Sequence, residues 1–213
     1  MRDLDRAQQA LALAGALVAH PRELARLPQW LRQRRAATMT LRSPWWPYAA
    51  VEWVASALPP QPRVFEYGGG GSTLWLEDRG AIVTVTEHDE GWHRELAGQL
   101  AYGTALLFRP PAATGSINSV AAPGYFDDYV AAIDGEPDSS LDLVIVDGRA
   151  RVECARRAMS KVKPGGLLLL DDTNRARYRP AEQTLSGWER HVFTGLKPGG
   201  GVPCQTSTWR RPA

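Results

Sequence analysis

The chain has few cysteines and almost no net charge. Its 213 residues include only 2 cysteines, Cys154 and Cys204, so we expect neither a disulfide framework nor a CxxC metal site. Such low cysteine use fits a reducing cytoplasm. A formal net charge of +2 predicts no nucleic-acid partner, because nucleic-acid-binding domains normally carry a strongly basic face. We interpret the one basic cluster, Arg32 with Arg34 and Arg35, as a solvated helix face.

Long apolar runs are also scarce. The alanine- and leucine-rich stretch at residues 10–19 is too short to cross a bilayer as a helix. The charges of residues 2, 3, 5 and 6 before it cancel, whereas a signal peptide begins with a positive region. We therefore expect a helix of a soluble, cytoplasmic protein with no membrane partner.

Glycine, by contrast, is concentrated in one place. Residues 63–77 read RVFEYGGGGSTLWLE, so the β-favouring Val64 and Phe65 precede four consecutive glycines, and Ser72 opens a helical segment. This pattern predicts a strand, a tight glycine turn and a helix start. Glycine lets a ligand approach the backbone closely, and a helix start offers unpaired N–H donors. A purely structural turn fits the same pattern.

Two ligand classes compete for this turn. A dinucleotide turn reads G-x-G-x-x-G, but Thr73 stands at the third glycine position. Glu66 ends the strand, and a carboxylate there suits a cationic amino-acid group and repels a pyrophosphate. The run E-Y-G-G-G-G resembles the first motif, E/D-x-G-x-G-x-G, of the class I S-adenosylmethionine-dependent methyltransferases. The resemblance implies S-adenosylmethionine as the cofactor.

A second strand predicted at residues 81–87 ends in an acid. An acid about 20 residues beyond the glycine turn binds ribose hydroxyls in nucleotide-binding α/β folds, so Glu87 supports an adenosyl ligand of either class. We interpret His88 as a neighbour of the adenine or as a surface residue. The residues expected to bind the cofactor are Glu66, Tyr67, Gly68, Gly70, Ser72, Thr73, Glu87, His88 and Asp147.

Strands and helices alternate along the rest of the chain. Strand patterns at 104–108, 141–147 and 167–170 are separated by helical patterns at 91–100, 125–133 and 152–162, with a long loop at 109–124. Strands at 191–194 and 204–209 have no helix between them and must be antiparallel. We predict an α/β fold with a doubly wound, mostly parallel seven-stranded sheet, helices on both faces and a C-terminal antiparallel hairpin. That hairpin resembles the class I methyltransferase core.

The first part of the chain predicts helices at residues 3–19 and 22–35, separated at Pro21. We assign residues 1–42 to an N-terminal helical extension and 43–213 to the S-adenosylmethionine-binding domain. By analogy, we expect such an extension to cover the cofactor cleft, to make a subunit contact, or both. A homo-oligomer is therefore one of the expected arrangements. Trp45, Trp46 and Trp53 follow, either as core or as an aromatic wall beside a small-molecule pocket.

Acids end two of the predicted strands, Asp147 after one and Asp171 with Asp172 after the other. Strand ends of an open α/β sheet face the ligand, so we expect these acids at the methyl acceptor. Catechol and caffeoyl-CoA O-methyltransferases, which the sequence resembles here, hold Mg²⁺ with an Asp and an Asp-Asn pair. The resemblance implies Mg²⁺ on Asp147, Asp171 and Asp172, but Ala150 stands where those families carry a general-base lysine.

Without a metal, catalysis rests on placing the acceptor in line with the methyl–sulfur bond. Asp147 or Asp171 is then expected as the general base or acceptor anchor. Arg149 is expected to hold an acidic acceptor group. His93 and His191 are further candidates for the base.

These observations predict a methyltransferase that transfers a methyl group to an oxygen or nitrogen of a small molecule. One alternative is a regulatory or other S-adenosylmethionine-binding protein that does not methylate. The other is an NAD(P)-dependent oxidoreductase, against which the missing third glycine and the terminal hairpin argue.

Overall fold

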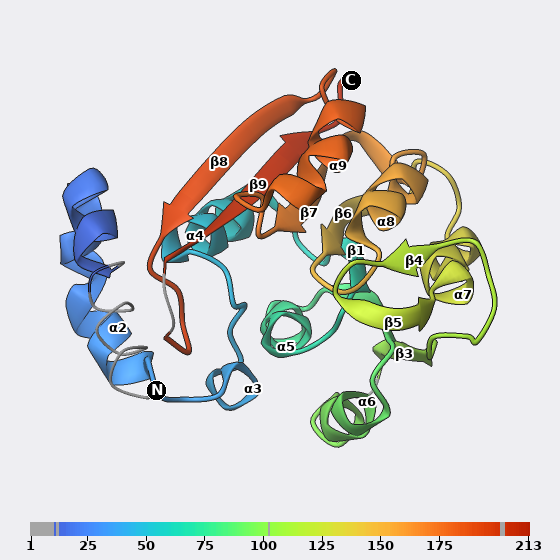
Figure 1. The fold of residues 1–213 in the computed structure, drawn as a ribbon, viewed down its shortest axis with the longest axis horizontal. Coiled ribbons are helices and arrows are strands. Elements are labelled where there is room, and N and C mark those ends of the chain that lie inside the picture. The colour runs from blue at the N-terminus through green and yellow to red at the C-terminus, as the bar shows by residue number, and fades with distance from the viewer. Residues whose placement is uncertain (1–10, 12, 102, 201–202) are drawn as a thin grey trace.

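The structure is a computed structural model that describes residues 11, 13–101, 103–200 and 203–213. At its centre lies a seven-stranded sheet in the order β3-β2-β1-β6-β7-β9-β8 (Figure 1). The strands are β1 (Arg63–Tyr67), β2 (Ile82–Glu87), β3 (Ala105–Phe108), β6 (Leu141–Val146), β7 (Val162–Asp171), β8 (Glu189–Gly195) and β9 (Cys204–Arg210).

The pairing within this sheet is parallel except at one edge. Strands β3, β2, β1, β6 and β7 run parallel, whereas β9 is antiparallel to both β7 and β8. Every residue of β6 is buried, as a continuous apolar run predicts for a central strand that is covered on both faces. The predicted mostly parallel sheet with a C-terminal antiparallel hairpin is confirmed.

Helices cover both faces of the sheet, because successive residues of a strand point to opposite sides. Phe65 and Val144 pack with helices α7 (Asp127–Ala131), α8 (Arg151–Ala158) and α9 (Arg179–Thr184). Their neighbours Val64 and Leu143 pack on the other face with α4 (Tyr48–Ala57) and α5 (Gly71–Glu77). The remaining helices with assigned bounds are η1 (Pro21–Arg26), α2 (Leu27–Gln33), α3 (Thr38–Leu41), α6 (Glu90–Ala97), η2 (Ala132–Gly135) and η3 (Ala176–Tyr178).

Two segments differ from the sequence-based prediction. The expected loop at 109–124 carries a small antiparallel pair, β4 (Asn118–Ser119) and β5 (Ala122–Tyr125), so the next helix starts only at Asp127. Strand β7 starts at Val162 rather than at residue 167. The glycines inside it do not break the strand, because Gly165 N–H donates to Arg211 O at 3.0 Å and Arg211 N–H donates to Gly166 O at 2.9 Å.

The N-terminal helices lie beside the loop between β8 and β9 (Figure 1). Residues 13–19 are helical, while residues 3–10 and 12 of the helix predicted at 3–19 lie outside the described part of the chain. Trp30 packs with Leu196, and the buried Glu23 carboxylate accepts a hydrogen bond from Leu196 N at 2.6 Å. Among the described residues, no helix combines the length and the apolarity that crossing a bilayer requires.

Candidate functional site

A cavity of about 520 Å³ opens at the carboxyl ends of the parallel strands. We divide its wall into two parts. The turn half consists of residues 68–72 after β1 and 87–89 after β2. The carboxylate half consists of Asp147, Arg151, Asp171 and Asp172, after β6 and β7. The other wall residues are Thr38, Trp45, Trp92, Gly148, Arg149, Arg175 and Lys197.

Most of the predicted site residues meet at this wall. Tyr67 and Thr73 do not, because both are fully buried behind it. The Tyr67 hydroxyl donates a hydrogen bond of 2.7 Å to the carbonyl of Val130 in the core. The predicted residues that line the cavity are Gly68, Gly70, Ser72, Glu87, His88, Asp147, Arg149, Asp171 and Asp172.

The two histidines considered as bases lie away from the cavity wall. His93 packs against Phe108 at a ring distance of 5.1 Å, and His191 packs against Trp53 at 4.7 Å. Neither ring lines the cavity, so the acids of the carboxylate half are the better placed proton acceptors.

Two glycines of the turn are required by packing against other segments of backbone. Gly68 has a φ of +88°, and a Cβ there would lie 2.7 Å from the Cα of Gly148. A Cβ on Gly71 would lie 2.6 Å from the carbonyl oxygen of Thr38. Glycine is therefore needed at these positions to let the turn contact the β6 loop and the N-terminal segment.

Glu66 lies beneath the turn and not on the cavity wall. Its carboxylate is fully buried and accepts hydrogen bonds from the hydroxyls of Ser72 and Thr73, the latter at 2.5 Å. Thr73 Oγ1 in turn accepts a 3.0 Å hydrogen bond from Gly70 N. Burial raises the pKa of Glu66 from its ordinary 4.5 to about 7, although the two hydroxyls oppose the shift. Glu66 thus ties the end of β1 to the start of α5 and fixes the turn from below.

Glu87 lies at the end of β2, where the sequence predicts a residue that binds ribose hydroxyls. Its side chain is buried at the end of β2, and its Oε1 accepts hydrogen bonds from the backbone N–H groups of His88 at 2.7 Å and Asp89 at 2.9 Å. Nδ1 of His88 lies 2.6 Å from the same oxygen. These contacts fix the carboxylate. Within the part of the chain that the structure describes, Oε2 has no hydrogen-bond partner, and this oxygen is left to accept from a ligand hydroxyl.

One buried arginine holds the carboxylate half together. Arg151 begins α8, and its guanidinium lies 2.9 Å from Asp147 Oδ1, 3.4 Å from Asp172 Oδ2 and 3.9 Å from Asp171 Oδ2. It also donates to the backbone carbonyls of Asp171 at 2.7 Å and Asp147 at 2.9 Å. Trp46 Nε1 donates to the second oxygen of Asp147 at 3.3 Å. The single charge of this arginine therefore offsets part of the repulsion among three acids, which burial would otherwise make costly.

Two of these acids have raised pKa values. Burial raises the pKa of Asp171 well above its usual range, and the neighbouring Asp147 and Asp172 charges add to the shift. Burial also raises the pKa of Asp147, while Arg151 opposes that shift. A raised pKa brings a carboxylate closer to the range in which it accepts a proton efficiently near neutral pH.

The predicted Mg²⁺ does not fit this arrangement. The guanidinium of Arg151 occupies the position among the three acids where a cation would sit, and Trp46 holds the other oxygen of Asp147. Among the described residues, no group of three or more acid, histidine or cysteine side chains is arranged to hold a metal ion. Mg²⁺ requires near-octahedral oxygen ligands, which these engaged carboxylates do not offer.

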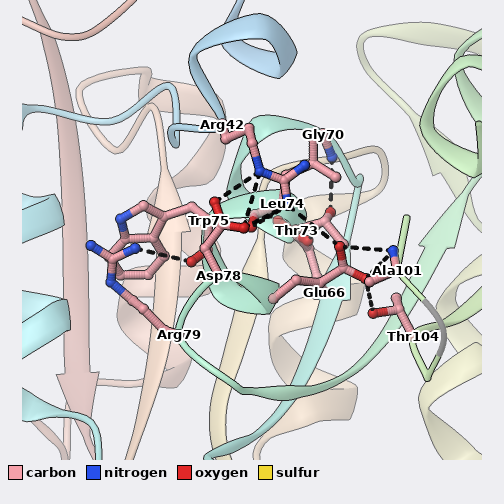
Figure 2. A network of polar contacts seen from close by, with 11 residues as sticks. Arg42, Glu66, Gly70, Thr73, Leu74, Trp75, Asp78, Arg79, Ala101 and Thr104 are labelled. Carbon is pink, nitrogen blue, oxygen red and sulfur yellow. Dashed lines mark hydrogen bonds and ion pairs between the residues drawn. The ribbon is translucent and has the colours of Figure 1, made fainter. Parts of the chain in front are cut away.

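The N-terminal segment closes one side of the turn half. Helix α3 packs on α5, and Arg42 donates to both carboxylate oxygens of Asp78, at 2.8 and 2.7 Å (Figure 2). Thr38 and Trp45 reach the cavity wall from this segment. The ammonium of Lys197 lies 3.9 Å from the centre of the Trp45 ring, which joins the segment to the β8–β9 loop.

Sequence reasoning missed several of these wall residues. Arg151 stands four residues after Asp147, and this spacing across a tight loop was the one local signal for their contact. Thr38 and Lys197 carry no motif. They reach the wall only because the fold brings distant segments to one edge of the sheet.

Comparisons with known proteins address the fold. No protein-family model matches the sequence, and no curated protein matches it. Solved structures do match. A methyltransferase-like protein of Silicibacter pomeroyi is 27% identical, with 78% of this chain and 88% of that chain covered and a TM-score of 0.50.

Some of the matched structures contain a bound cofactor or product. The O-methyltransferase TomG of Streptomyces achromogenes, in complex with SAM, is 16% identical and covers 74% of this chain and 77% of its own, with a TM-score of 0.52. A 1,6-didemethyltoxoflavin-N1-methyltransferase of Burkholderia thailandensis, with bound S-adenosylhomocysteine, is 12% identical and covers 97% and 90%, with a TM-score of 0.52. This chain has the class I methyltransferase fold. In this chain the turn half lies at the ends of β1 and β2, and the carboxylate half lies at the ends of β6 and β7.

Proposed function

We propose that this protein is an S-adenosylmethionine-dependent methyltransferase that acts on a small-molecule acceptor. One observation carries the proposal: a single cavity joins the glycine turn and Glu87 to buried acids with raised pKa values. The turn half provides backbone N–H groups and a ribose acceptor, and the carboxylate half provides a proton acceptor. The class I methyltransferase fold of the chain supports the cofactor assignment.

The chemistry required of the chain is modest. When bound, S-adenosylmethionine would supply an electrophilic methyl carbon, whose bond to sulfur breaks as the acceptor oxygen or nitrogen forms a new one, the electron pair remaining on sulfur. Placing the two reactants in line supplies much of the reduction in barrier. The residues of the turn half hold one reactant, and those of the carboxylate half orient the other.

Asp171 is the best candidate for accepting the acceptor's proton. Its Oδ2 lies 3.9 Å from the Arg151 guanidinium, whereas Oδ1 of Asp147 lies only 2.9 Å from it. The Thr206 hydroxyl donates to the other oxygen of Asp171 and orients the carboxylate. Since burial raises its pKa and Arg151 holds it less closely, Asp171 is more basic than Asp147. Asp147 then serves as an anchor for Arg151.

The size of the cavity favours a small acceptor. A volume of about 520 Å³ lies within the range of roughly 300–1,000 Å³ that is typical of small-molecule sites. The matched structures include enzymes of small molecules and a tRNA methyltransferase of Aquifex aeolicus. The formal net charge of +2 does not favour the nucleic-acid alternative.

A second candidate is an S-adenosylmethionine-binding protein that does not methylate. This candidate is supported by the contacts of the acids: Arg151 and Trp46 bind Asp147, and Thr206 binds Asp171. Acids that already have partners are less available to accept a proton from a methyl acceptor. Both candidates require the same cofactor and differ only in the transfer step.

Two assays test the proposal. Calorimetric titration with S-adenosylhomocysteine and, separately, with NAD⁺ distinguishes the cofactor classes, and we expect saturable binding of the first compound only. Methyl-labelled S-adenosylmethionine is then incubated with the protein and fractionated small-molecule extracts. We expect label in a small-molecule fraction, reduced for Asp171→Asn with unchanged S-adenosylhomocysteine binding. Binding of NAD⁺ alone overturns the proposal. Binding of S-adenosylhomocysteine without label transfer to any fraction supports the second candidate.

A further inference from the structure

A second cavity, of about 310 Å³, lies against the loop that joins β6 to α8. Residues 147–149 of this loop line the main cavity described above, residues 150, 152 and 153 line the second cavity, and Arg151 lines both. The loop therefore separates the two cavities. The second volume reaches the lower end of the range of roughly 300–1,000 Å³ that is typical of small-molecule sites.

Three segments that are distant in the chain enclose the second cavity: β4 with its turn, the first part of α8, and the segment from η3 into α9 (Figure 1). Ala150 N–H donates to Ser119 Oγ at 3.4 Å and joins the loop to β4. The buried ring of Tyr178 has its centre 5.1 Å from the guanidinium carbon of Arg151 and 5.1 Å from that of Arg177. These contacts fix the wall through the tertiary fold.

Part of this wall is apolar and open to solvent. Val120, in the turn after β4, is 73% exposed although it is a large apolar side chain. Val152 and Pro180 line the cavity from the two helical segments, together with the ring of Tyr178. A ligand that covered these side chains would remove apolar surface from water, which contributes about 25 cal/mol per Å². The cavity therefore suits a ligand with an apolar body.

The charged side chains of the wall leave one cation available. Arg156 lies 2.7 Å from Glu153 in an ion pair, and Arg151 is held by the acids of the main cavity. Arg177 is exposed and, among the residues that the structure describes, has no acidic partner. Its guanidinium also lies beside the Tyr178 ring, at the apolar part of the wall. A planar guanidinium pairs well with a carboxylate through two parallel hydrogen bonds.

We propose that the second cavity is a small-molecule site that takes a flat apolar ring carrying one carboxylate. The ring lies against Val120 and Val152, and the carboxylate pairs with Arg177. This site is additional to the cofactor and acceptor sites of the proposed function, because its wall shares only Arg151 with the main cavity.

Cinnamate and its neutral counterpart cinnamamide test the site by calorimetry at constant ionic strength. We expect saturable binding of cinnamate that Arg177→Met weakens about tenfold, because the carboxylate loses hydrogen bonds to a charged group. Arg177→Lys, which keeps the charge, should lie between the wild type and Arg177→Met. The matched control is Arg179→Met, since Arg179 is exposed on the same segment but does not line the cavity. Cinnamamide should bind more weakly than cinnamate and should not distinguish Arg177→Met from the wild type.

A second pair of variants tests the apolar part of the wall. Val120→Ser should weaken cinnamate and cinnamamide alike, by about fivefold, because less apolar surface is removed from water. Val192→Ser is its matched control, since Val192 is 50% exposed on β8 and does not line either cavity. It should bind both compounds like the wild type.

Arg149→Met, on the wall of the main cavity, reports where the probe binds. Loss of cinnamate binding in Arg149→Met but not in Arg177→Met places the probe in the main cavity and overturns the second site. Absence of saturable binding, or equal weakening by Arg177→Met and Arg179→Met, also overturns it. These titrations contain no cofactor, so cinnamate binding that depends on Arg177 supports the second site even in a protein that binds no S-adenosylhomocysteine.

Discussion

The two halves of the cavity are built in different ways. The turn half is made by neighbours in the chain, residues 68–72 and 87–89, which are held by hydrogen bonds to hydroxyls and backbone N–H groups of adjacent residues. The carboxylate half gathers Asp147, Arg151 and Asp171 from three elements and depends on a buried balance of charge. The turn half is therefore fixed by local hydrogen bonds, whereas the carboxylate half depends on one side chain. The two halves should therefore respond to different perturbations.

Removing the arginine should give the largest effect. Arg151→Met leaves Asp147 and Asp171 without a cationic partner and Asp172 with only the exposed Arg175, and we expect a loss of about 3–5 kcal/mol in the free energy of unfolding at pH 7. Urea denaturation measures it. The matched control is Arg156→Met on the same helix, whose exposed pair with Glu153 at 2.7 Å should contribute less than about 1 kcal/mol. Equal stability of the two variants would mean that Arg151 does not hold the carboxylate half together.

The pH dependence of stability probes the turn half. Because the pKa of Glu66 is raised in the folded state, from 4.5 to about 7, the folded protein binds this proton more tightly than the unfolded chain. Stability from this group is full below pH 4.5 and is lost as the pH rises through about 7, a change of about 3 kcal/mol. Glu66→Gln removes the titration. Urea denaturation at pH 5 and pH 8 measures the free energy of unfolding of both proteins. We expect Glu66→Gln to become more stable relative to the wild type at pH 8 than at pH 5. The same stability difference at both pH values would contradict the assignment.

The turn glycines differ in whether the backbone around them can accept a Cβ, and alanine substitutions at Gly68 and Gly70 compare the cost in stability. Gly68→Ala places a Cβ at a φ of +88° and against Gly148, so we expect it to cost about 1–3 kcal/mol or more in thermal or urea unfolding. Gly70→Ala is its matched control, since the nearest atom to a Cβ there is a Trp92 ring carbon at 3.4 Å. A similar cost for both variants would show that the contact between the β1 and β6 turns is not what requires glycine.

Divalent metal should have the smallest effect. Millimolar Mg²⁺ or Mn²⁺ added to the wild type should leave the melting temperature unchanged, because the Arg151 guanidinium already occupies the position among the acids. The same addition to Arg151→Met reports whether the vacated cluster binds a cation. Saturable stabilisation of the wild type that Asp172→Asn abolishes would restore the metal hypothesis.

The features that the sequence predicted are those that depend on residues close together in the chain. The order of strands and helices follows from local periodicity, and the terminal hairpin follows from the missing helix between residues 194 and 204. The turn and Glu87 were predictable because their residues are adjacent in the chain or set by a fixed spacing. The glycines that interrupt β7 suggested a break, but pairing with Arg211 keeps them in the strand, and such pairing depends on residues far away in the sequence.

The carboxylate half was only partly predictable. Asp147, Asp171 and Asp172 were placed correctly at strand ends, but their partner was not, because no periodicity tells which way Arg151 points from the start of a helix. The acids alone suggested Mg²⁺, and the guanidinium among them corrects that hypothesis. Trp45 and Lys197 reach the cavity from opposite ends of the chain, so their contact depends on the whole fold.

The most direct test of the proposed cofactor site is a calorimetric titration of S-adenosylhomocysteine into the wild type, Glu87→Ala and Asp171→Asn. We assign ribose binding to the turn half alone. We therefore expect Glu87→Ala to weaken binding about 10- to 100-fold, through the loss of hydrogen bonds to a charged group, while Asp171→Asn binds like the wild type. Wild-type affinity in Glu87→Ala, or no binding by any of the three proteins, would contradict this assignment.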